Sequence, residues 1–103
     1  MTPEGKNVEY IKRRIHSIGG EVRKCNWSGV RGAPDLFILL PNFHAFCEVK
    51  APGKAPQPHQ LREIDRLINA GCRVFIVSNR ADVDWMIEVL QQFVRAERDT
   101  HDE

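Results

Sequence analysis

The chain has 103 residues, the usual size of one compact domain. No apolar run approaches the roughly 18 residues that cross a bilayer, so we expect no transmembrane helix and no membrane partner. The net charge of +1 hides an asymmetry, because residues 1–62 hold ten Lys and Arg against five Asp and Glu, and residues 63–103 hold five against nine. The basic first part would attract a polyanion.

The chain start lacks the apolar run of a secretion signal, which predicts a cytoplasmic protein with reduced thiols. Its three cysteines, Cys25, Cys47 and Cys72, are an odd number at wide spacings, so neither disulfides nor a zinc site is expected. We interpret them as small core residues. The histidines form no ligand pattern either.

Strong helix signals open the chain, with Thr2 as cap, Pro3 at the first helical position and Gly19-Gly20 as the end. A helix is therefore predicted over Thr2 to Ile18. Its apolar residues recur at helical spacing and should face a sheet: Val8, Ile11, Ile15 and Ile18.

Three strands are predicted next, over Glu21 to Trp27, Asp35 to Leu40 and Phe43 to Lys50. A glycine-rich loop, residues 28–32, leads into the second strand, and Pro41-Asn42 forms the turn before the third. The last two strands are apolar on both faces, which is typical of strands covered by helices on each side.

After a proline-rich loop over residues 51–56, a second helix is predicted from Pro58 to Gly71, a buried strand over Arg73 to Ser78, and a third helix over about Ala81 to Val94. The second helix has four apolar residues on one face: Leu61, Ile64, Leu67 and Ile68. A charged tail that frays should follow the third helix, so we predict a domain over residues 1–97 and a tail over 98–103.

This order, αβββαβα, combines a hairpin with a crossover connection. The predicted fold is a single α/β domain in which a mixed four-stranded sheet is flanked by helices on both faces. Trp27, Tyr10 and Trp85 are expected mainly in the core, and the last two are also candidates for a dimer contact.

The hairpin predicts where chemistry gathers. A symmetric turn at Pro41-Asn42 would place Asp35 opposite Glu48, and strand alternation would point Lys50 to the same face as Glu48. Burying two acids beside a lysine is costly unless a partner compensates. A hard divalent cation, Mg²⁺ or Mn²⁺, is the natural partner, and it would polarise a phosphodiester and acidify water.

These residues carry a family resemblance. Pro34-Asp35 followed by Glu48-Val49-Lys50 resembles the PD-(D/E)XK signature of restriction-endonuclease-like nucleases. More narrowly, the stretches around them, residues 32–37 and 48–54, followed by Gln60, resemble the VRR-NUC (virus-type replication-repair nuclease) family, in its stand-alone phage type. The likeness spans nearly the whole chain.

The resemblance implies that Asp35, Glu48 and the backbone carbonyl of Val49 bind the metal, that Lys50 assists the nucleophile, and that Gln60 belongs to the catalytic site. It also implies an acid on the first helix. Helical spacing favours Glu4, which lies one turn before Val8 on the inward stripe and could reach the metal through water. Glu9 is rotated roughly 100° away from that stripe.

The resemblance further implies a DNA-repair endonuclease that cuts flaps or Holliday junctions as a homodimer. Phosphate contacts are expected from Arg31 and Lys54 in flexible loops, and also from Lys24 and Arg23. DNA, and no small molecule, is the expected substrate. A catalytically silent nucleic-acid-binding or adaptor domain with the same fold is the alternative.

Overall fold

The computed structural model describes residues 1–102, with side chains up to residue 96. Three helices and four strands follow one another in the predicted order αβββαβα. Their bounds are α1 Pro3–Ser17, β1 Glu21–Lys24, β2 Leu36–Leu40, β3 Phe43–Val49, α2 Pro58–Asn69, β4 Val74–Val77 and α3 Arg80–Asp102.

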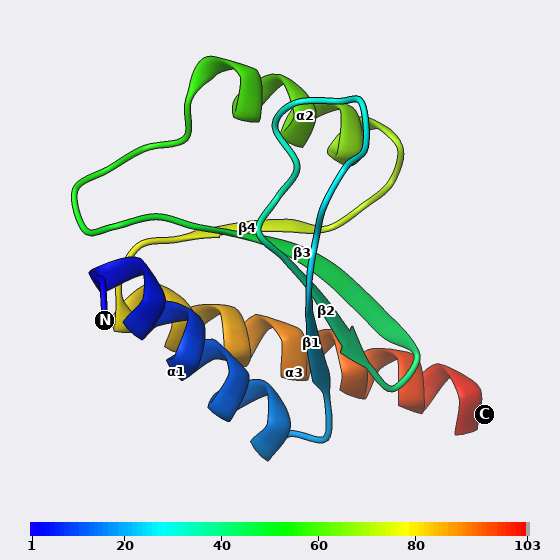
Figure 1. Ribbon diagram of the computed structural model, residues 1–103. Coiled ribbons are helices and arrows are strands. Elements are labelled where there is room, and N and C mark those ends of the chain that lie inside the picture. Colours follow the sequence, from blue (N-terminus) through cyan, green and yellow to red (C-terminus); the bar gives the residue numbers. More distant parts are fainter. Residues whose placement is uncertain (103) are drawn as a thin grey trace.

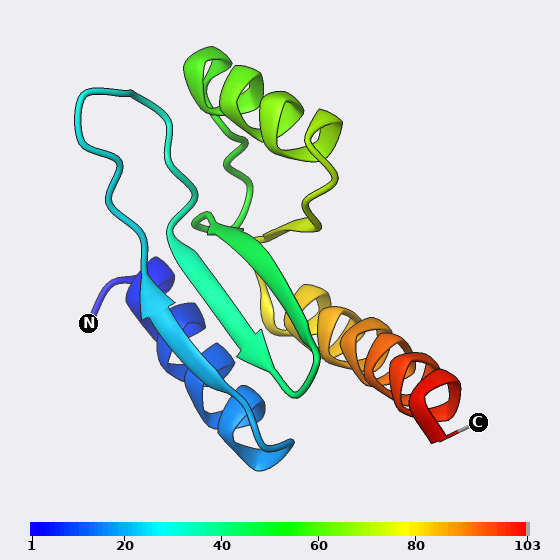
Figure 2. The same ribbon diagram turned by 90° about the vertical axis from the view of Figure 1, so that its right-hand side faces the viewer.

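The four strands form one mixed sheet in the order β1-β2-β3-β4. The first three strands are antiparallel neighbours, and β4 lies parallel to β3 because α2 carries the chain across between them. In Figure 1, α1 and α3 lie side by side on one side of the sheet and α2 lies on the other. Figure 2 shows that α2 sits at one end of the strands. The predicted fold is confirmed.

The hydrophobic core fills the space between the sheet and the pair α1 and α3. Strand residues that point to this side are almost fully buried, and so are the inward residues of both helices. Fully buried members, with 0 or 1% of their surface exposed, include Ile11, Ile15, Leu36, Ile38, Cys47, Met86, Ile87 and Leu90. The buried stripe of α1 begins at Asn7, not at Val8, which is only partly buried.

Helix α2 covers less of the sheet than the sequence pattern suggests. Only Ile64 of its four predicted inward residues is buried; Leu67 is partly buried, and Leu61 and Ile68 are 45% and 51% exposed. Helical spacing predicts which residues share a face but not whether a neighbour covers that face. Since α2 lies across one end of the sheet, most of its apolar face has no strand beneath it.

Several other predictions are wrong. Strand β1 ends at Lys24, before Trp27, and Cys25 and Cys72 are only partly buried. Trp85 is 58% exposed and packs edge-on against Phe75, so it lies at the rim of the core.

Helix α3 does not end near Val94 but continues to Asp102, because residues 95–102 contain neither glycine nor proline. The boundary between a domain over 1–97 and a tail over 98–103 stays a prediction, and Glu103 lies outside the described residues. Within the described part of the chain, no helix has the length and apolarity to span a bilayer.

Candidate active site

The β2–β3 hairpin has the predicted register. Phe37 pairs with Phe46 and Leu36 with Cys47, so the next step toward the open end brings Asp35 beside Glu48. The turn is tight because Asn42 adopts the left-handed conformation, with φ of 60°, which asparagine tolerates better than most residues. A two-residue turn thus fixes the positions of two acids at the far end of the strands.

Glu48 is the most unusual residue of this site. Its side chain is 1% exposed, yet neither carboxylate oxygen takes part in a hydrogen bond. Burial and, to a lesser extent, the adjacent Asp35 carboxylate raise the pKa of Glu48, the Lys50 ammonium lowers it, and together they bring it to about 8. Asp35 itself is exposed, and its Oδ2 accepts a hydrogen bond of 2.7 Å from the Val49 amide. The pair therefore combines a buried carboxylate with an accessible one.

Lys50 and Gln60 complete the central group. Lys50 Nζ lies 3.6 Å from Glu48 Oε2 and donates a hydrogen bond of 2.9 Å to Gln60 Oε1. The same Gln60 oxygen accepts a 2.8 Å hydrogen bond from the Gln57 amide at the start of α2. Gln60 thus joins the first turn of α2 to the lysine that follows β3.

The loop between β1 and β2 holds α2 in place. Gly32 has a φ of +93°, and a Cβ at this position would lie 2.6 Å from the His59 carbonyl oxygen. The Trp27 indole donates a 2.7 Å hydrogen bond to Glu63 and packs edge-on against Phe46. Trp27 is therefore partly buried at the junction of loop, sheet and helix, and not in the main core.

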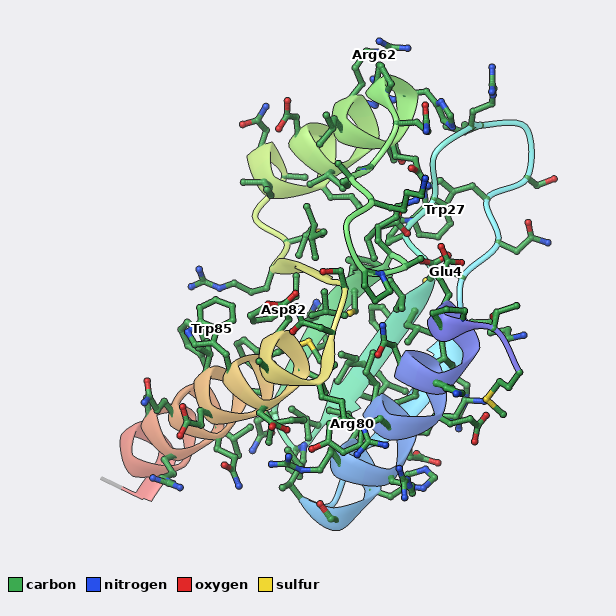
Figure 3. All side chains as sticks on the ribbon, turned by 90° about the vertical axis from the view of Figure 1, so that its left-hand side faces the viewer. Glu4, Trp27, Arg62, Arg80, Asp82 and Trp85 are labelled. Carbon is green, nitrogen blue, oxygen red and sulfur yellow. The ribbon has the colours of Figure 1, made fainter. Side chains whose placement is uncertain are left out.

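Glu4 and Asp35 line the same pocket on the α1 side. This pocket has a volume of about 330 Å³ and is also lined by Lys24 and Val49. Figure 3 shows Glu4 and Trp27 at the same end of the molecule. Among the described side chains, those of residues 1–96, no three His, Cys, Asp or Glu are close enough to hold one ion, so Glu4 is not a direct third ligand here. Glu9 faces elsewhere, and its Oε1 lies 3.8 Å from Lys12 Nζ.

The expected phosphate contacts differ in their surroundings. Arg31 and Lys54 are exposed in the loops that precede β2 and follow β3, and Lys24 borders the Glu4 pocket. Arg23 is already engaged, because its guanidinium lies 3.1 Å from Glu21.

The sequence analysis did not identify Asn7 as a residue of this region. The Asn7 amide is buried against the backbone beyond β3 and β4. An asparagine among apolar residues at helical spacing was the available signal.

The chain resembles known proteins in sequence and in fold. No family model matches the chain. The chain is 38% identical over 73 residues to "Putative nuclease p44" of Acyrthosiphon pisum secondary endosymbiont phage 1, which covers 70% of this chain and 78% of that protein. A solved structure described as a VRR_NUC domain superposes with a TM-score of 0.81 at 42% identity, over 85% of this chain and 97% of the other. The chain belongs to the VRR-NUC family of nuclease domains.

Proposed function

We propose that this nuclease is a divalent-metal-dependent DNA endonuclease that acts on branched DNA, a flap or a Holliday junction, as a homodimer. The observation that carries the proposal is the Glu48 carboxylate, which is buried beside a second acid without a hydrogen bond. Burying an acid beside a second one costs several kcal/mol unless their charges are compensated, and the Lys50 ammonium, 3.6 Å from Glu48, compensates only in part because the pKa of Glu48 stays raised.

A hard cation fits this donor set. Asp35 and Glu48 offer carboxylate oxygens and Val49 offers a backbone carbonyl, which are the ligand types that Mg²⁺ and Mn²⁺ prefer. When bound, the ion would polarise the scissile phosphodiester and lower the pKa of water. The exposed side of Asp35 leaves room for a substrate phosphate, and Glu4 borders the same space through the adjoining pocket.

The remaining groups have distinct tasks in this proposal. The Lys50 ammonium stabilises negative charge on the attacking oxygen or on the phosphate. Gln60 accepts a hydrogen bond from Lys50 and thereby limits the positions that the flexible lysine can sample. Arg31 and Lys54 contact phosphates on either side of the scissile bond.

Selectivity for DNA shape is supported by the size of the fold. In the described part of the chain, α1 and α3 pack on the sheet and α2 contacts the site through Gln60, so the fold has no separate module for reading bases. Two copies acting together would cut two strands, as the resolution of a four-way junction requires.

Cleavage of labelled flap, four-way junction and linear duplex DNA with Mg²⁺, Mn²⁺ or chelator tests the proposal. Wild-type protein should cut branched DNA with Mg²⁺ or Mn²⁺ and should not cut it in chelator. Lys50→Ala and Asp35→Asn should cut at least about 100-fold more slowly than wild type. Lys12→Ala, which removes a partly exposed lysine that pairs with Glu9 on α1 outside the proposed site, is the matched control and should cut normally.

Circular DNA separates endonuclease from exonuclease activity, and light scattering reports the oligomeric state. Cleavage in chelator, or an unchanged rate for Lys50→Ala, would show that the assigned chemistry is wrong. Binding of junction DNA without any cleavage would instead favour the silent adaptor.

A further inference from the structure

Asn7 occupies a position where α1 otherwise places apolar side chains. It precedes Ile11 and Ile15 in the stripe that faces the sheet, and only 7% of its surface is exposed. A buried amide without partners costs roughly 1 to 3 kcal/mol, so its hydrogen bonds indicate what it does.

Both hydrogen bonds of the Asn7 amide go to the backbone beyond the parallel strands. Nδ2 donates to the Ser78 carbonyl at 3.0 Å and to the Lys50 carbonyl at 3.4 Å. Lys50 and Ser78 are the residues that immediately follow β3 and β4. Asn7 therefore links the ends of two strands that are distant from it in sequence.

The Lys50 backbone has few other restraints. Its amide donates to the Val77 carbonyl at 2.8 Å, and the chain then leaves the sheet into the proline-rich loop. On the opposite side of the sheet, the Lys50 ammonium contacts Glu48 and Gln60. A lysine side chain has four rotatable bonds, so the position of its ammonium depends on a fixed backbone.

We propose that Asn7 is a positioning residue for the reaction: it fixes the Lys50 backbone from the α1 side, so that the ammonium meets the acid pair. This inference rests on the proposed function for the role of Lys50. Asn7 lies about one helical turn after Glu4, so its hydrogen bonds to Lys50 and Ser78 also fix the position of the first turn of α1 relative to the sheet.

Asn7→Leu keeps the branched shape of the side chain, at a somewhat larger volume, and removes the amide donor of both hydrogen bonds. Because a displacement of about 1 Å can cost about 100-fold in rate, we expect kcat on branched DNA to fall by roughly 10- to 100-fold, with KM within about twofold. Ile15→Ala, which weakens the same stripe without touching Lys50, is the matched control and should keep kcat when assayed well below its melting temperature. Asn7→Ala carries the same test if the leucine variant does not fold.

Two readouts separate positioning from general stability. In a Lys50→Ala background, Asn7→Leu should cause no further loss of rate, because residues that act through one another are not additive. Amide hydrogen exchange should show lower protection of the Lys50 amide in Asn7→Leu than in wild type. The Phe46 amide, which donates a hydrogen bond to the Arg73 carbonyl between β3 and β4, is the internal control and should keep its protection.

The outcomes also separate this inference from the proposed function. Normal kcat and normal Lys50 protection in Asn7→Leu overturn the inference, and so does an equal loss of kcat in Ile15→Ala. If wild-type protein cuts no DNA, the proposed function fails, and the exchange measurement alone then decides whether Asn7 fixes the Lys50 backbone.

Discussion

Replacing Glu48 by glutamine should stabilise the metal-free protein, and more so at high pH. The buried carboxyl has a pKa raised from 4.5 to about 8, so the folded chain holds its proton to a higher pH than the unfolded chain does. Between these two values the folded state binds more protons, and its stability therefore falls as pH rises. Glutamine does not titrate, so the variant lacks this loss.

The size of the effect follows from the shift. Each pH unit inside the window costs about 1.4 kcal/mol, and over the range from about pH 5.5 to about pH 8 the loss amounts to roughly 3 kcal/mol. In a domain of this length, 1 kcal/mol moves the melting temperature by about 4 to 8 °C. Between those two pH values, the advantage of Glu48→Gln in melting temperature should therefore widen by roughly 12 to 24 °C.

Thermal unfolding in chelator at both pH values, followed by circular dichroism, measures this difference. Glu9→Gln removes an exposed acid on α1 and is the control. At the higher pH, Mg²⁺ or Mn²⁺ should raise the melting temperature of wild type and leave that of Glu48→Gln almost unchanged, since only the carboxylate can serve as an anionic ligand. A difference between wild type and Glu48→Gln that stays constant from low to high pH would refute the reasoning.

Four further substitutions test the surroundings of the site. Gly32→Ala forces a Cβ against the first turn of α2 and should cost about 1 to 3 kcal/mol in urea unfolding and slow cleavage more than about 10-fold; an unchanged rate would show that this contact does not place the helix. Trp27→Phe deprives the Glu63 carboxylate of an indole donor and should lower the unfolding free energy by about 1 to 3 kcal/mol, whereas no loss would mean that water replaces the bond. Arg31→Ala and Lys54→Ala should each reduce the salt dependence of DNA affinity by about one phosphate contact, and an unaltered slope in fluorescence anisotropy would exclude that residue.

The acid pair was predictable because its causes are local. A two-residue turn and the alternation of strand side chains determine which residues lie opposite each other, and these rules bring Asp35 beside Glu48 without knowledge of the rest of the fold. The spacing from Glu48 to Lys50 places the ammonium by the same rule.

The supports of the site were not predictable because they join distant segments. The Trp27 indole meets Glu63, and the Asn7 amide meets Ser78, across separations that no periodicity encodes. The exposed apolar face of α2 has the same origin, because burial of Leu61 or Ile68 depends on what another element covers.

The small buried surface of α2 should make this helix easier to detach than the rest of the fold. Only Glu63 and Ile64 of the helix are buried, so its detachment exposes little apolar area and should need far less free energy than global unfolding. Brief excursions of this kind would carry Gln60 away while the layer of α1, α3 and the sheet stays intact. The sheet with α1 and α3 should therefore be the more stable part of the fold, and α2, which contacts Lys50 through Gln60, the less stable part.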